Sequence, residues 1–123
     1  MTHDLLMGTF DELPSEEPYP GVRRSAFSSE RATVTTYWFQ PGARFPIHRH
    51  PEEQITLIEE GDVEFTVGGE VHALSAGAWS VVAGDVEHGI RAGEHGARFV
   101  AIVSPARPRN DAYSVVAEQE AGS

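Results

Sequence analysis

The sequence contains neither cysteine nor lysine. Without cysteine, the chain can form no disulfide, no thiolate metal ligand and no cysteine nucleophile. Without lysine, it cannot form a Schiff base through a side-chain amine. Basic residues are few, nine arginines against nineteen acidic residues, and the formal net charge at pH 7 is −10. We therefore expect no nucleic acid and no anionic membrane as a partner, because both are bound by basic surfaces.

Long hydrophobic runs are absent too. No apolar stretch approaches the roughly 20 residues of a membrane-spanning helix. The opening residues, MTHDLLMG, lack the basic lead and the apolar core of a secretory signal. We therefore expect a soluble, cytoplasmic protein. A length of 123 residues allows one domain with a single modest core.

Short segments rich in β-branched and aromatic residues follow one another along the middle of the chain. They cover residues 33–39, 54–60, 62–67, 70–74, 79–82, 87–91 and 98–104. Gly68-Gly69 is typical of a tight hairpin turn, and no long window shows the period of an amphipathic helix. This pattern predicts an all-β fold, either a sandwich or a barrel.

The two ends of the chain differ from this middle part. Residues 11–24 are rich in proline and acidic residues, which favours an extended conformation. We divide the chain into an N-terminal arm (residues 1–32), a barrel (33–105) and a polar C-terminal tail (106–123). Within the tail, the stretch DAYSVV has the composition for either an edge strand or a final turn.

Two histidines stand one residue apart in the stretch HRHPEEQ, residues 48–54. On a strand, residues i and i+2 face the same side, so His48 and His50 lie next to each other. Such a pair alone is either part of a solvated strand or half of a metal site. Gln54 opens the next segment, and His88 opens a later one that barrel closure brings alongside.

The wider pattern resembles the two motifs of the cupin family. Residues 42–61, GARFPIHRHPEEQITLIEEG, match the first motif, with Gln54 where a glutamate is usual. Residues 77–88, GAWSVVAGDVEH, match the second, with Ala83 and Asp85 in place of a proline and a glycine. The resemblance implies a double-stranded β-helix, or jelly-roll barrel. It also implies one divalent transition metal ion per chain (Zn, Mn, Fe, Ni or Co), held by His48, His50, Gln54 and His88.

Glutamine in place of glutamate changes the expected chemistry. A neutral amide leaves more positive charge on a divalent site than a carboxylate does, which strengthens the Lewis acid and stabilises higher oxidation states less. This favours a redox-neutral isomerase, lyase or cyclase. A metal dioxygenase is the alternative chemistry, and a non-catalytic small-molecule-binding cupin is a second alternative.

A narrower resemblance links the chain to small bacterial cupins that open unsaturated uronate sugars or cyclise aromatic polyketides. It rests on the first-motif stretch HRHPEEQ and on the later stretches HGIRA and SPAR. In the sugar-acting group, an aspartate occupies the position of Ala101. No catalytic acid or base can be assigned from the sequence.

Strand parity predicts which residues share the face of the ligands. We expect these residues to line a cavity for a small-molecule substrate: Trp38, Thr56, Ile58 and Ile90. Tyr37 or Phe39 is the alternative to Trp38. Such a cavity would be mostly apolar and best suited to an aromatic or polyketide-like compound. By the same parity, Ile55 and Leu57 face outward and need a cover. We therefore expect a homodimer, with the N-terminal arm as an alternative cover.

Overall fold

The computed structural model describes residues 4–107 and 113–117, and almost every regular element in them is a strand. The predicted all-β fold is confirmed. A short 3₁₀ turn, η1, comes first, and no helix in this part of the chain is long and apolar enough to cross a membrane. The elements are η1 (Phe10–Glu12), β1 (Glu16–Tyr19), β2 (Val22–Ser28), β3 (Thr33–Phe39), β4 (Arg44–Arg49), β5 (Glu53–Val67), β6 (Glu70–Ser75), β7 (Trp79–Val82), β8 (His88–Ser104) and β9 (Ser114–Ala117).

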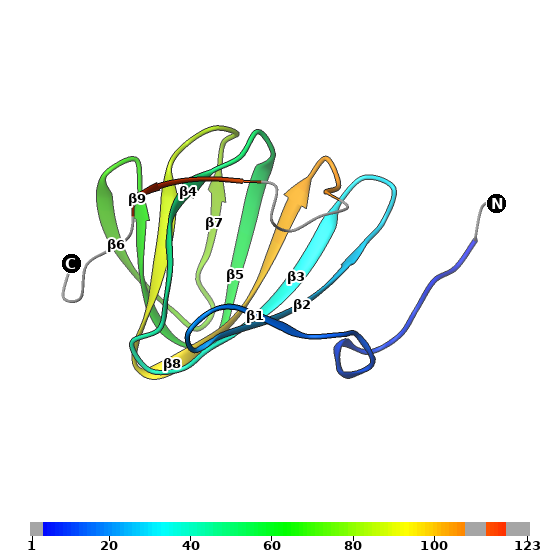
Figure 1. The fold of residues 1–123 in the computed structure, drawn as a ribbon, viewed down its shortest axis with the longest axis horizontal. Coiled ribbons are helices and arrows are strands. Elements are labelled where there is room, and N and C mark those ends of the chain that lie inside the picture. Colours follow the sequence, from blue (N-terminus) through cyan, green and yellow to red (C-terminus); the bar gives the residue numbers. More distant parts are fainter. Residues whose placement is uncertain (1–3, 108–112, 118–123) are drawn as a thin grey trace.

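One sheet curls on itself to enclose the core (Figure 1). Its strand order is β1-β2-β3-β8-β4-β9, and β5 pairs with β6, β7 and β8. The long strand β8 is the centre of this arrangement. Its first residues pair with β4, its last with β3, and β5 pairs along most of its length.

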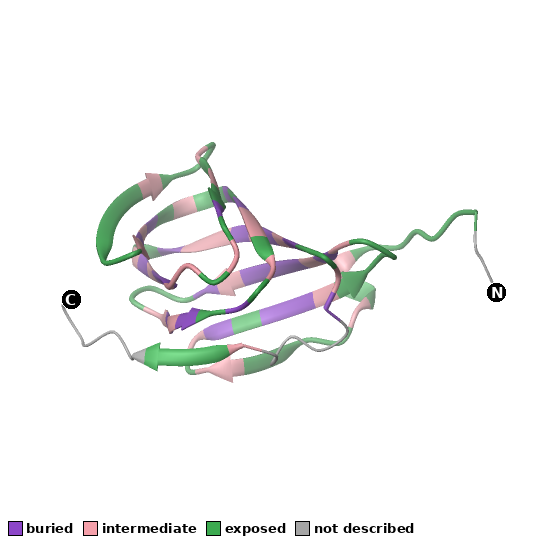
Figure 2. Ribbon diagram, turned by 90° about the horizontal axis from the view of Figure 1, so that it is seen from above, coloured by how far each residue is buried: buried purple, intermediate pink, exposed green. Residues whose placement is uncertain are grey.

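Aromatic side chains from several strands fill the interior. Tyr37 stacks on Phe99 with 4.9 Å between ring centroids, and Phe45 meets Tyr37 edge to face at 6.1 Å. Buried and exposed residues alternate along the strands, as Figure 2 shows in bands of different colour. This is the period of two that a strand with one buried face requires.

Two pairs of predicted segments turn out to be single strands. Residues 54–60 and 62–67 both belong to β5. Residues 88–91 of the predicted segment 87–91 belong to β8, as do residues 98–104. Gly61 causes an irregularity in the register without ending the strand, at a φ of +79°. A glycine in a strand interior is therefore a bulge here and not a turn.

Both predicted end segments contribute strands. Residues 16–28 of the N-terminal arm form β1 and β2, and β2 pairs with β3 from Val22↔Phe39 to Ser28↔Thr33. In the C-terminal tail, β9 pairs with β4. This strand falls in the stretch DAYSVV, whose composition allowed an edge strand. Residues 111 and 112 of that stretch lie outside the described residues. The sheet therefore extends beyond the predicted barrel on both sides.

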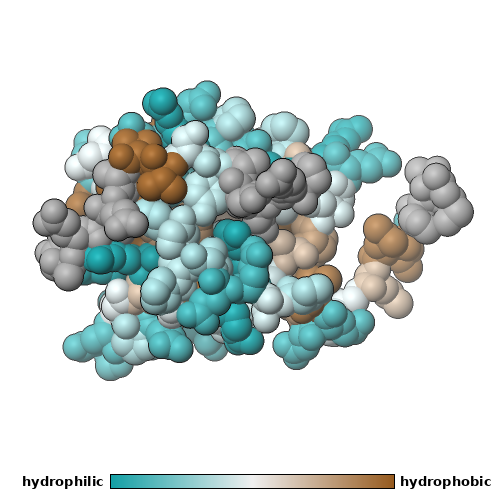
Figure 3. Space-filling view, viewed as in Figure 1, coloured by the Kyte–Doolittle hydropathy of each residue, from teal (hydrophilic) through white to brown (hydrophobic). Residues whose placement is uncertain are grey.

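An apolar surface lies on the outer face of β5 and β7. Leu57 is 39% exposed and its neighbour across the pair, Trp79, is 69% exposed. Val81, opposite Ile55, is exposed as well. The side in Figure 3 is mostly hydrophilic, with hydrophobic side chains gathered at the position of β9, where Val115 and Val116 are exposed. The predicted homodimer stays a prediction.

Replacing Gly61 by alanine tests the bulge in β5. A Cβ at Gly61 would collide with the carbonyl oxygen of Gly96 on β8, and the φ of +79° is strained for alanine. We expect Gly61→Ala to lower the free energy of unfolding by about 3 kcal/mol. Gly68→Ala is the matched control: φ is +55° and nothing lies within 4 Å, so it should cost only about 1 kcal/mol. If urea unfolding shows that the two variants lose equal amounts of free energy of unfolding, the close approach of β5 and β8 at Gly61 is contradicted.

Candidate metal centre

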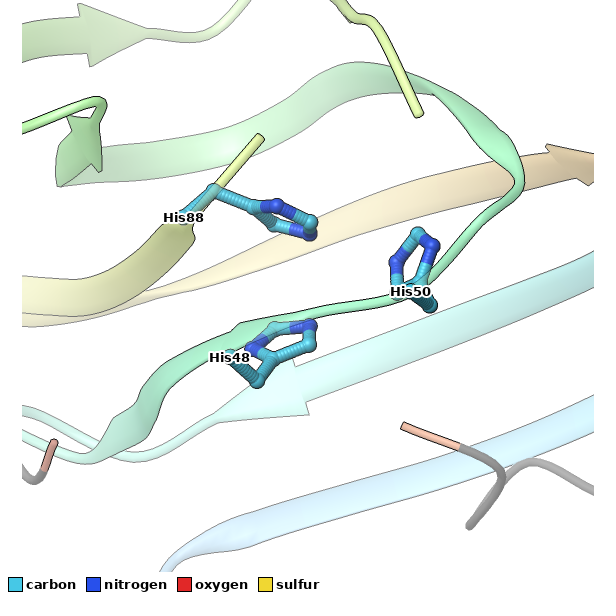
Figure 4. A group of neighbouring side chains, drawn as sticks. All are labelled: His48, His50 and His88. Atoms are coloured by element: carbon cyan, nitrogen blue, oxygen red, sulfur yellow. The ribbon is translucent and has the colours of Figure 1, made fainter. Parts of the chain in front are cut away.

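Three buried histidines meet at one end of the barrel interior (Figure 4). His48 lies in β4 and His50 just after its end, while His88 is the first residue of β8. His48 and His88 are directly opposite each other in the β4–β8 pair. One ring nitrogen from each histidine lies within 4.8 Å of the others.

A tight turn before His88 holds the two histidine segments together. The backbone N–H of Asp85 donates to the carbonyl oxygen of His50 at 2.8 Å. Asp85 has a φ of +65°, a conformation that suits glycine and that aspartate tolerates better than most residues. This explains why the resembled motif has glycine at this position. A Cβ on the preceding Gly84 would collide with the carbonyl oxygen of Pro51, so that glycine permits the close approach.

Each imidazole is oriented by a hydrogen bond from Nδ1 to a backbone carbonyl two residues away. The acceptors for His48, His50 and His88 are the oxygens of Pro46, Glu52 and Val86, at 2.8, 3.1 and 2.9 Å. A carbonyl oxygen only accepts, so Nδ1 must carry the ring proton. In the neutral ring Nε2 is then a lone-pair donor, which is the arrangement that metal-ligating histidines use.

Gln54 presents its oxygen to the same point. Its Oε1 lies 3.1 Å from Nε2 of His50 and 3.2 Å from Nε2 of His88. Its amide nitrogen donates to the hydroxyl of the buried Thr56 at 3.1 Å. In this orientation Nε2 and Oε1 are both acceptors when the rings are neutral, and a cation between them would make their close approach favourable. Two ligands each about 2.1 Å from one ion lie roughly 3.0–3.4 Å apart, so the spacing fits.

The electrostatics of the pocket keep the imidazoles neutral. Burial lowers the pKa of His48 to about 3, and the neighbouring His88 adds to the effect. Burial also lowers the pKa of His88 to about 4 and moves that of His50 in the same direction. The charge of Arg107 contributes to all three shifts. At neutral pH the three rings are unprotonated and suited to bind a metal ion.

A small cavity of about 30 Å³ adjoins the histidines. Thr56 and Ile90 line it, as do Tyr37 and Phe39. Trp38 differs from the expectation: it lies on the outer face of β3, where the Arg23 guanidinium stacks 4.4 Å from its ring centroid. The remaining expected residue, Ile58, is buried in the core but is not part of the lining.

A second hollow, of about 600 Å³, contains none of the three histidines. Its lining includes Asp62, Glu64, Leu74 and Arg91. We place the candidate site at the smaller cavity, because His48, Gln54 and His88 line it.

Sequence reasoning missed three polar residues of the cavity, Arg24, Tyr113 and Arg107. Tyr113 packs edge to face on the ring of His48 at 5.0 Å, and its hydroxyl bonds to that of Tyr19 at 2.8 Å. Burial raises the pKa of Tyr113, so its hydroxyl holds its proton at neutral pH. All three lie in segments interpreted as arm or tail. For Arg24, the sequence offered one signal: side chains alternate between the two faces along the strand VRRSAFS, which puts Arg24 on the same face as Val22.

Residues 36–103, more than half of the chain, match the family model of the cupin domain. A curated relative is dimethylsulfoniopropionate lyase DddW from Ruegeria pomeroyi. It is 39% identical over 61 residues, which are 50% of this chain and 40% of that protein. The chain therefore matches only about two fifths of that relative's length.

Solved structures of cupins share the fold. An RmlC-like cupin from Shewanella frigidimarina has a TM-score of 0.75 at 25% identity, covering 87% of this chain and 95% of that one. KdgF from Halomonas sp. has a TM-score of 0.74 at 26% identity, covering 83% and 97%. A variant of oxalate decarboxylase from Bacillus subtilis reaches 0.81 at 17% identity, covering 93% and 34%, which shows the fold alone. The predicted double-stranded β-helix barrel is confirmed.

Ligand substitutions test the predicted metal set. We expect close to one transition metal ion per wild-type chain after dialysis. His50→Ala and His88→Ala should each weaken binding at least about a hundredfold, because each removes an imidazole that its carbonyl partner already orients. Gln54→Ala should lose metal only in part, and Gln54→Glu should bind at least as tightly, because it adds a negative charge. His72→Ala, on the exposed side of β6, is the control.

Elemental analysis and calorimetry of the wild type and the five variants measure metal content and affinity. If Gln54→Ala keeps full metal at unchanged affinity, Gln54 does not ligate the ion. If wild type binds none of Zn, Mn, Fe, Co or Ni, the predicted site is wrong.

The stability of the metal-free protein should depend on pH. Because the pKa values of His48 and His88 are lowered on folding, the unfolded chain binds more protons below about pH 6.5, so acid favours unfolding. Each of these two histidines should cost about 2 kcal/mol between pH 6.5 and pH 5. Urea unfolding at pH 7.5, 6.5 and 5 measures this loss. His88→Gln should reduce it and His72→Gln should not; a pH-independent stability would contradict the burial of neutral rings.

Proposed function

The chain belongs to the cupin family, and on that premise we propose that it is a metal-dependent enzyme. Its proposed reaction is a redox-neutral one of the lyase or isomerase type on a small oxygenated organic substrate. The observation that carries the proposal is the convergence of three neutral imidazoles and one amide oxygen, with His48, Gln54 and His88 in the wall of a small cavity.

The donor set suits a divalent transition metal ion, because imidazole nitrogen and amide oxygen are ligands of intermediate hardness. Such an ion supplies a Lewis acid for a substrate oxygen and lowers the pKa of bound water. His48, His50, Gln54 and His88 would hold it. The backbone carbonyls that accept from each Nδ1, together with the hydroxyl of Thr56, keep these four side chains in place.

Other residues of the chain would shape the reaction. Phe45 and Phe65 line the cavity beside the histidines and would give a substrate an apolar surface to pack against. The hydroxyl of Tyr113, which is bonded to that of Tyr19, is placed to donate a hydrogen bond to a substrate oxygen. An aromatic polyketide is too large for the present cavity of about 30 Å³, so we favour a small substrate.

Two observations support redox-neutral chemistry over a dioxygenase. Gln54 brings no negative charge to the ligand set, which favours a strong Lewis acid over a high oxidation state. The relative from Ruegeria pomeroyi is named a lyase, and it matches half of this chain. Dimethylsulfoniopropionate therefore belongs in the first substrate panel.

Turnover with parallel measurement of dissolved oxygen tests the proposal. Protein loaded with Zn, Mn, Fe, Co or Ni is incubated with dimethylsulfoniopropionate and other small hydroxy, keto and acyl compounds. We expect product without oxygen consumption, lost on chelation and in His50→Ala and retained in His72→Ala. Stoichiometric oxygen uptake would identify a dioxygenase. Saturable binding without turnover across the panel would identify a non-catalytic binding protein.

A further inference from the structure

Among the residues that the structure describes, two arginines and no carboxylate line the cavity beside the histidines. Its charged or ionisable lining residues in this part of the chain are Arg24, Tyr37, His48, His88, Arg107 and Tyr113. The whole chain has nineteen acidic residues and a net charge of −10. Negative charge is thus abundant on the protein and missing from the described wall of this cavity.

Arg24 reaches the cavity from β2, and its side chain is only 4% exposed. Its guanidinium carbon lies 6.0 Å from the ring centroid of Phe45, and that ring lies 4.8 Å from the ring of His48. In the β2–β3 pair Arg24 is opposite Tyr37, whose side chain lines the same cavity. A buried guanidinium and the candidate metal centre therefore share one small space.

The carboxylate of Glu16 pairs with Arg24 from outside the cavity. Oε1 of Glu16 accepts from Nε of Arg24 at 2.7 Å, and the side chain of Glu16 is 61% exposed. The carboxylate thus approaches from the solvent side and uses Nε, one of the five N–H groups of a guanidinium. The side chain of Tyr37 also bonds to Arg24, so a carboxylate on one side and a neutral phenol on the cavity side hold the guanidinium in place.

Arg107 adds a second positive charge, with a side chain 8% exposed. Its NH1 lies 3.7 Å from Oε1 of Glu52, which in turn lies 3.3 Å from Nδ1 of His50. In the described part of the chain, the carboxylates of Glu16 and Glu52 near the site each face an arginine. A divalent ion on the histidines would therefore bring positive charge that no cavity-lining side chain of the described chain balances.

We propose that the substrate is a small carboxylate anion whose carboxylate group binds Arg24, with its other end facing the histidines. Arginine is the side chain best suited to this task, because its fork matches the two carboxylate oxygens. The cavity has room for two or three water-sized groups, since one buried water needs roughly 10–15 Å³. The position of the reacting end at the metal rests on the proposed function; the carboxylate subsite does not.

Acetate and acetamide, which have the same shape and differ in charge, test the subsite. Calorimetric titration of the metal-loaded protein should give a Kd for acetate at least tenfold lower than for acetamide. Arg24→Gln should raise the Kd for acetate at least tenfold while metal stoichiometry stays at the wild-type value. Arg23→Gln makes the same charge change on the exposed outer face of β2 and should leave this Kd within twofold.

Two further measurements keep the outcome decisive. Arg24→Lys retains the positive charge but lacks the forked guanidinium. If Arg24→Gln does not fold, a Kd for acetate in Arg24→Lys that lies above the wild-type value supports the proposal. On the metal-free protein at matched ionic strength, acetate should raise the Tm more than acetamide does, and the Arg24 variants should reduce that difference. If acetate raises the Tm in this way while the protein binds none of the tested metal ions, the proposed function fails and the carboxylate subsite stands. Equal binding of acetate and acetamide, or wild-type acetate binding in both Arg24 variants, would overturn the subsite.

Discussion

The pairing of β4 with the start of β8 is the contact on which the candidate site depends. It places His48 opposite His88 and Phe45 opposite Ile90, so one short ladder sets both a ligand pair and part of the cavity wall. The hydrogen bond from Asp85 to His50 closes the same junction from the other side. Since each Nδ1 is bonded to a carbonyl of its own segment, the ring directions follow from the backbone path.

The grouping of His48, His50, Gln54 and His88 in space was predictable because its information is local. Parity on a strand puts His48 and His50 on one face, and the spacing to Gln54 and His88 matches two short motifs. Parity also placed Thr56 and Ile90 at the cavity, because each follows a predicted ligand, Gln54 or His88, by two residues on its strand. Whether the four residues hold a metal ion stays a prediction.

The remaining residues of the site could not be predicted, for physical reasons. In TVTTYWF, Tyr37, Trp38 and Phe39 are all large and aromatic, so parity alone cannot say which face is inside. The structure turns Trp38 outward, under Arg23. Arg24 is harder still: it lies in a segment whose prolines and acidic residues indicate an arm, and β2 buries its charge where a hydrophobic pattern predicts an apolar residue.

The role of β8 as a shared strand has a consequence for how the protein folds. Its partners β3, β4 and β5 come from earlier parts of the chain, and such non-local pairing makes folding slow. His48 and His50 are neighbours before any of this ladder exists, whereas His88 joins them only when β8 is in place. A metal ion present early can therefore bind the unfolded chain through this pair. Such binding reduces the net stabilisation that the ion gives to the native state.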